Sequence, residues 1–143
     1  DFLQCAFGPV ARVHAVNRRW SHEVTDNVTA IFDFANGATG VLELSWTFPK
    51  GAGALELTGE KGVLRTNDAG FEITFKDEKC KPVQVNHGDV KAIPDSHATF
   101  VQNIARGVKD AWGAGREALA LCEAINDASR TGRGVRPRNR AAR

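Results

Sequence analysis

The sequence predicts an α+β domain with an open, mostly antiparallel β-sheet and helices packed on one face of that sheet. Strand-like runs fill the chain up to residue 85, whereas helical periodicity begins only at residue 96. Strands followed by helices, rather than alternating with them, are typical of α+β proteins. The organising feature is a hairpin over residues 28–48, where Asn36-Gly37 separates two runs rich in β-branched and aromatic residues.

The hairpin predicts a sheet that is apolar on both faces. A two-residue turn at Asn36-Gly37 would pair Phe34 with Thr39 and Phe32 with Val41. The opposite face would then carry Ile31, Leu42, Leu44 and Trp46. A sheet with one solvated face normally alternates apolar and polar residues, and this one does not. We therefore expect helices to cover one face and a second subunit or domain to cover the other.

The chain opens inside a structural pattern. Residues 1–7 are typical of the end of a helix that Gly8-Pro9 terminates, and the sequence contains no Met. We therefore expect a piece of a longer protein, cut within a helix. Residues 1–135 would form one domain, and residues 136–143 would be a basic tail within a loose segment that starts at Arg133.

Five further strands are expected outside the central hairpin, one of them a weak edge strand. Their β-branched and aromatic residues lie between Gly-, Pro- and Asn-rich stretches, and Gly59 to Gly62 is predicted to turn a second hairpin. The expected strands cover residues 10–16, 54–58, 63–66 and 71–75, with a weak edge strand at 82–85.

Two helices are predicted in the last third of the chain. The first begins at Ser96 and places apolar residues at helical spacing up to Val108. The second begins at Arg116 and ends at Gly132, since a glycine past the last turn is a common helix terminator. Its buried face is expected to hold Ala118, Leu121, Cys122, Ile125 and the pair Ala128-Ser129.

Composition excludes several classes of protein. Hydrophobic residues make up 42% and charged residues 25% of the chain, and the net charge is +2. No apolar run reaches the ~20 residues of a membrane span, and the arginines of the tail lack the interleaved aromatic residues of a nucleic-acid site. The three cysteines and four histidines have no metal-ligand spacing. Three distant cysteines favour reduced thiols in a cytoplasmic protein.

Two residues are candidates for a substrate site. Trp46 ends the hairpin just before residues 49–53 (PKGAG) interrupt the sheet, so it is either a core residue or the wall of a ligand pocket. His97 lies on the first turn of a helix, after a capping Asp95-Ser96 pair. It is either a core or capping histidine or a polar group at the rim of a pocket.

Four segments together resemble a known family. They are FGPVARVHAV, DNVTAIFDFANGATGVLELSWTFPKGAGALELTGEKGVLRTN, DSHATFVQNIARGVKD and GREALALCEAINDASRTGRGV. Their motifs and order resemble the C-terminal domain of the glucose–fructose oxidoreductase, inositol dehydrogenase and MocA family. The resemblance extends from Asp1 to Val135.

The resemblance implies a two-domain NAD- or NADP-dependent oxidoreductase. A missing N-terminal Rossmann domain would bind the cofactor, and this domain would supply walls of the substrate pocket and an oligomer interface. The reaction would be hydride transfer to or from a secondary alcohol of a sugar- or polyol-like substrate, and this piece would be inactive alone. The alternative is a stand-alone binding or assembly module that uses an exposed sheet face.

The resemblance also bears on individual residues. Asp1 matches the last Asp of the family's Asp…His…Asp helix motif, whereas Glu60-Lys61-Gly62 does not match the catalytic Glu-Lys-Pro motif. No residue of this chain resembles the family's general base or its cofactor-binding residues. We therefore expect no catalytic, cofactor-binding or metal residues here, and we expect Asp1, Trp46 and His97 to bind substrate.

Overall fold

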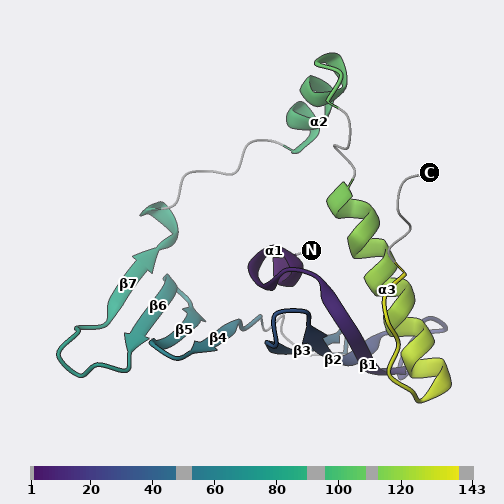
Figure 1. Ribbon diagram of the computed structural model, residues 1–143, viewed down its shortest axis with the longest axis horizontal. Helices are drawn as coiled ribbons and strands as arrows, with labels where there is room; N and C mark the ends of the chain where they lie inside the picture. The colour runs from purple at the N-terminus through teal and green to yellow at the C-terminus, as the bar shows by residue number, and fades with distance from the viewer. Residues whose placement is uncertain (1, 48–52, 90–95, 109–112, 139–143) are drawn as a thin grey trace. The chain divides into compact units, whose positions relative to one another are not determined.

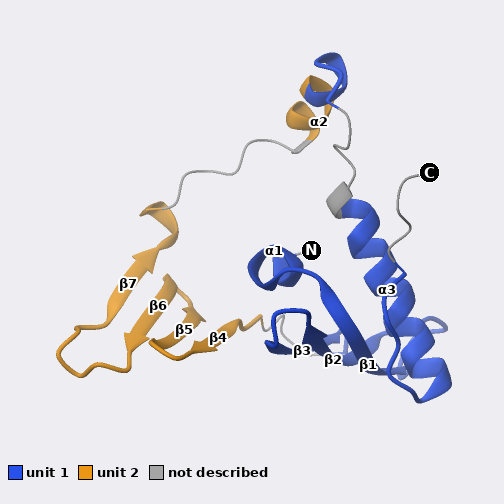
Figure 2. Cartoon of the chain, in the orientation of Figure 1, with its two compact units in different colours: residues 1–49, 103–143 blue, residues 50–102 orange. Residues whose placement is uncertain are grey.

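The computed structural model describes residues 2–47, 53–89, 96–108 and 113–138, and it confirms the α+β class. These residues form two antiparallel sheets and three α-helices. The chain divides into two compact units, residues 1–49 with 103–143 and residues 50–102 (Figure 2). The helices are α1 (Phe2–Phe7), α2 (Ser96–Ala105) and α3 (Gly113–Thr131), with a short 3-10 turn, η1 (His87–Asp89).

The first unit is built on a three-stranded sheet in the order β1-β2-β3. Its strands are β1 (Val10–Arg18), β2 (Asn27–Phe34) and β3 (Thr39–Ser45). Helix α3 runs along β1 and covers one face of the sheet (Figure 1). The core between them consists of Val10, Val13, Ala30, Phe32, Phe34, Leu121, Ala124, Ile125 and Ala128. Helix α1 closes one end, where the rings of Phe7 and Phe34 lie 5.2 Å apart.

The expected hairpin is present, but its predicted register is wrong. Phe32 pairs with Gly40 rather than with Val41, and Asp33 pairs with Thr39. The reason is a three-residue loop: Gly37 N–H donates to Phe34 O (3.0 Å), Gly37 has φ +88°, and Phe34 N–H donates to Ala38 O (2.9 Å). A turn followed by a left-handed glycine is the standard form of such a loop.

The one-residue shift changes which side chains share a face. Leu42 lies on the core face with Phe32, and Val41 lies on the open face with Ile31, the reverse of the prediction. Gly40 gives the rings room, because a Cβ there would lie 3.1 Å from Phe34 Cε2. The open face still carries apolar residues that are 45–65% exposed, namely Val16, Ile31 and Val41.

Most residues that were predicted to be buried on helix α3 are indeed buried or partly buried. Leu121, Ile125 and Ala128 are buried as expected, whereas Cys122 is exposed and Ala124 takes its place in the core. The prediction was wrong at Cys122 because the stripe that meets the sheet follows 121, 124, 125 and 128, the i, i+3, i+4, i+7 spacing. The helix runs to Thr131, and Gly132, with φ +66°, terminates it as predicted.

The segment after α3 is not loose over its whole described length. Val13 and Val135 exchange two backbone hydrogen bonds of 2.8 and 2.9 Å and form an antiparallel bridge beside β1. Gly134 allows this approach, because a Cβ at that position would meet the side chains of Arg12 and His14. The expectation of a loose segment from Arg133 is therefore wrong at Val135.

The second unit is a four-stranded meander in the order β4-β5-β6-β7. Its strands are β4 (Glu56–Gly59), β5 (Gly62–Asn67), β6 (Gly70–Phe75) and β7 (Val83–Asn86), which confirm the strands expected in this part of the chain. Glu60-Lys61 forms the turn of the predicted second hairpin, since Gly59 pairs with Gly62.

Candidate functional site

The most unusual polar group in the described residues is the carboxylate of Asp26, in the loop between β1 and β2. Its side chain is fully buried, although the loop around it is exposed. The backbone N–H groups of Trp20, Ser21 and His22 donate to it over 2.7–3.1 Å, and Asn27 Nδ2 donates over 2.8 Å. The carboxylate therefore organises the loop from within.

The hydrogen bonds decide the charge of Asp26. Burial alone would raise its pKa, but the donors Ser21 N–H, Trp20 N–H, Asn27 and His22 outweigh burial and hold the pKa well below its usual range. Asp26 is thus an anion at neutral pH. Sequence analysis missed this residue, because nothing in its neighbours marks it as buried.

The Asp26 loop holds two aromatic side chains at the end of the sheet. His22 Nδ1 lies 3.1 Å from Asp26 Oδ2, and the His22 ring meets the Trp46 ring edge-on with centroids 5.8 Å apart. Trp46 N–H donates to Asp26 O (2.9 Å), which ties the end of β3 to the same loop. Trp46 is 70% exposed and His22 has a side-chain exposure of 48%.

The three predicted site residues, Asp1, Trp46 and His97, do not lie together in one described part of the structure. Trp46 is exposed, so its interpretation as a core residue is wrong. His97 is also exposed on α2, so its interpretation as a core residue is wrong as well. Asp1 lies outside the described residues. Trp46 and His97 belong to different units, and each is therefore described by itself.

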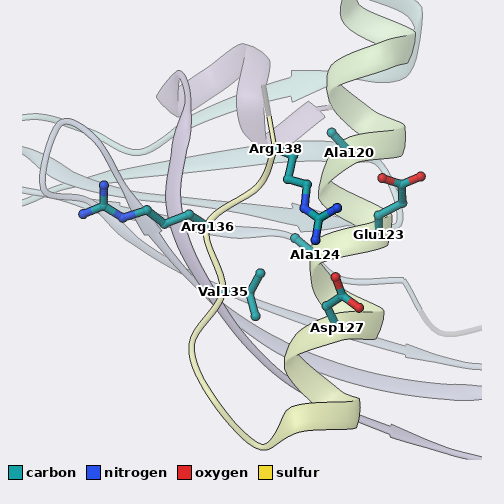
Figure 3. Close-up of a pocket in the computed structure, with 7 residues that line it drawn as sticks. All are labelled: Ala120, Glu123, Ala124, Asp127, Val135, Arg136 and Arg138. Atoms are coloured by element: carbon teal, nitrogen blue, oxygen red, sulfur yellow. The ribbon is translucent and has the colours of Figure 1, made fainter. Parts of the chain in front are cut away.

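A hollow lies between α3 and the segment that follows it (Figure 3). Its volume is about 260 Å³, and Arg138 extends along α3 beside Glu123 and Asp127. Asp127 also pairs with Arg130 at 2.9 Å, and this hydrogen bond lowers the pKa of Asp127. The Asp127 carboxylate therefore already interacts with arginines of the same chain.

Two kinds of cofactor or metal motif are not found among the described residues. None of their strands is followed by a glycine-rich turn that opens a helix, the unit that holds a dinucleotide pyrophosphate. No three His, Cys, Asp or Glu side chains in the described ranges are grouped as metal ligands. No described helix combines the length and apolar character needed to cross a membrane.

Comparison with known proteins bears on both the sequence and the fold. The sequence profile of the GFO/IDH/MocA C-terminal domain matches residues 1–65. No curated protein matches the chain.

Solved structures share the fold along nearly the whole chain. An oxidoreductase from Agrobacterium radiobacter, in complex with NAD+, L-tartaric acid and magnesium, is 18% identical, with a TM-score of 0.75 over 95% of this chain and 46% of that one. A levoglucosan dehydrogenase in complex with NADH and L-sorbose is 19% identical, with a TM-score of 0.75 over 96% of this chain and 47% of that one.

A third structure is the WlbA dehydrogenase from Bordetella pertussis, in complex with NADH and UDP-GlcNAcA. It is 24% identical, with a TM-score of 0.68 over 94% of this chain and 41% of that one. The chain thus spans less than half the length of these structures. Residues 1–65 are thus similar to the GFO/IDH/MocA C-terminal domain, and the chain shares its fold with these dehydrogenase and oxidoreductase structures.

Proposed function

We propose that this chain is the substrate-pocket and oligomerisation domain of an NAD- or NADP-dependent oxidoreductase that acts on a sugar- or polyol-like secondary alcohol. The family match over residues 1–65 carries this proposal. Structures with the same fold are complexes with NAD+ or NADH and with L-tartaric acid, L-sorbose or UDP-GlcNAcA. The cofactor would be held by a second, dinucleotide-binding domain, since the described residues of this chain do not form one.

Within that enzyme, the chain's own residues would bind and orient the alcohol. Asp1, Trp46 and His97 are the proposed pocket residues, with Trp46 as an apolar wall and His97 as a hydrogen-bonding group. The exposure of Trp46 and His97 supports this role, because a pocket wall must be accessible to its ligand. The proposal places the protein in the cytoplasm, where Cys5, Cys80 and Cys122 would stay as the free thiols they are here.

The experiment is an assay of the complete reading frame that contains this chain. NAD+ and NADP+ reduction would be followed at 340 nm with a panel of aldoses, polyols and hydroxy acids. We expect turnover of at least one sugar- or polyol-like alcohol by the complete protein and none by the 143-residue chain. Turnover by the 143-residue chain, or a complete protein that reduces neither cofactor, would contradict the proposal.

His97 is tested in the complete enzyme by His97→Asn. As a pocket group it would donate a hydrogen bond worth about 0.5–1.5 kcal/mol, so kcat/KM should fall roughly two- to tenfold at unchanged Tm. His87→Asn is the matched control, because His87 is an exposed histidine of the same unit. A lowered Tm with kcat/KM unchanged would remove His97 from the pocket.

We also propose that the chain self-associates through the open face of the three-stranded sheet. Val16, Ile31 and Val41 lie there on neighbouring strands, and each is 45–65% exposed. An apolar stripe on a flat sheet suits a second copy of the same face, and stable interfaces bury about 1,200 Å² or more.

Sedimentation of the chain at tens of micromolar tests this interface. Ile31→Glu should convert the oligomer to monomer, because it places a charge in the centre of the stripe. Leu119→Glu is the control, since Leu119 is also exposed but lies on α3. A wild-type chain that sediments as a monomer would count against the interface.

A further inference from the structure

The hydrogen bond to Asp26 selects one tautomer of the neutral His22 imidazole. An ionised carboxylate only accepts hydrogen bonds, so the 3.1 Å contact between His22 Nδ1 and Asp26 Oδ2 requires Nδ1 to carry the proton. In the neutral ring, Nε2 is then left as an acceptor. The same carboxylate is fixed by three backbone N–H groups, so the orientation of the imidazole depends on a rigid support.

The His22 side chain is partly open to solvent. The side chain is 48% exposed, and none of the hydrogen bonds among the described residues involves Nε2. The ring packs at an interplanar angle of 85° against Trp46, whose indole is 70% exposed. A fixed acceptor therefore lies beside a large, accessible apolar surface.

The fold of the loop between β1 and β2 does not by itself require the contacts of the His22 imidazole with Asp26 and Trp46. The backbone donors of Trp20, Ser21 and His22 and the amide of Asn27 already satisfy the Asp26 carboxylate. Tryptophan combines a large apolar surface with a polar N–H group and is enriched at interfaces, so an exposed indole such as that of Trp46 can stack on a bound partner. The exposed indole and the oriented imidazole are thus the features that a purely structural role leaves unexplained.

We propose that His22 and Trp46 form a binding subsite for a pyranose ring, with Asp26 as the positioning residue. A sugar hydroxyl donates to His22 Nε2, and a C–H face of the ring stacks on the Trp46 indole. The ligand class in this inference rests on the proposed function. The sequence indicated Trp46 as a possible pocket residue, whereas nothing in the sequence indicated His22 or its contact with Trp46.

The test is a titration of the isotope-labelled 143-residue chain with D-glucose, observed by NMR. We expect saturable shift changes at the His22 ring and the Trp46 indole N–H. His22→Ala and Trp46→Ala should each weaken binding about three- to tenfold or more, as for the loss of one hydrogen bond or one stacked face. His87→Ala, which removes an exposed imidazole from η1, is the matched control and should leave binding unchanged.

Asp26→Asn tests the positioning role separately. Imidazole ¹⁵N shifts report which nitrogen carries the proton, and we expect the Nδ1–H form in the wild type and a mixture in the variant. A chain that stays folded, loses the single tautomer and binds glucose more weakly supports positioning. A wild-type ring that is protonated on Nε2 would overturn the proposal.

The outcomes also separate this inference from the proposed function. If the complete enzyme oxidises a sugar while His22→Ala leaves its KM unchanged, the subsite is wrong and the oxidoreductase proposal stands. If glucose binds at His22 and Trp46 but the complete protein reduces no nicotinamide cofactor, the subsite stands and the oxidoreductase proposal is wrong. Shifts at these residues that follow protein concentration rather than glucose would assign them to self-association and overturn the subsite.

Discussion

Replacing Phe32 with alanine tests which face of the hairpin is the core. Phe32 is 1% exposed, lies opposite Val13 and Gly40 in the neighbouring strands, and has its ring 6.4 Å from that of Phe34. Because Gly40 contributes no side chain, nothing on β3 at that level can move in to fill the space. The cost should lie in the range of about 3–5 kcal/mol typical of buried Phe→Ala substitutions.

The neighbouring residue provides the control. Ile31 is 45% exposed on the opposite face, so Ile31→Ala should cost about 1 kcal/mol, roughly half the value of full burial. Since a protein of this size loses about 4 °C of Tm per kcal/mol, Phe32→Ala should lower Tm by about 10–20 °C and Ile31→Ala by about 4 °C.

Urea unfolding followed by circular dichroism measures both variants at the same protein concentration. A low concentration, at which the chain is monomeric, keeps the effect of Ile31 on self-association out of the comparison. Equal losses for the two variants, or a larger loss for Ile31→Ala, would refute the assignment of Phe32 to the core face.

Three further predictions follow from single features. Because the pKa of Asp26 is lower in the folded chain than its ordinary value of about 4, its contribution to stability should be present above pH ~4 and be lost as the pH falls below it; pH-dependent urea midpoints should show this loss in the wild type and a shallower one in Asp26→Asn. Gly62→Ala would push a Cβ into the backbone carbonyl of Thr74 and should cost about 2 kcal/mol, whereas Gly59→Ala, whose Cβ would meet open space, should cost less than about 1 kcal/mol; thermal unfolding compares them. Calorimetric titration of the 143-residue chain with NADH and NADPH should show no saturable binding at millimolar concentration. Saturable binding would contradict the proposal that a separate domain holds the cofactor.

The elements and their order followed from local patterns. Asn36-Gly37 located the central turn, and Gly8-Pro9 and Gly132 located the ends of two helices, because these residues act on the backbone within a few positions. The family resemblance also rested on motifs that are continuous in sequence. Local backbone preference and periodicity were therefore sufficient for the fold class.

The register and the site required the tertiary structure. The sequence Asn36-Gly37 is compatible with both a two-residue and a three-residue loop. In the folded chain the three-residue loop is accompanied by a hydrogen bond from Ala35 N–H to Pro9 O (2.9 Å), and Pro9 lies in the segment between α1 and β1. The one-residue difference in loop length decides which face Val41 occupies. Likewise, Asp26 becomes a buried anion only when a loop folds around it, and His22 and Trp46, 24 positions apart, meet only through that loop and the end of β3. Contacts between distant segments carry no local sequence pattern, and for that reason only the folded chain decided them.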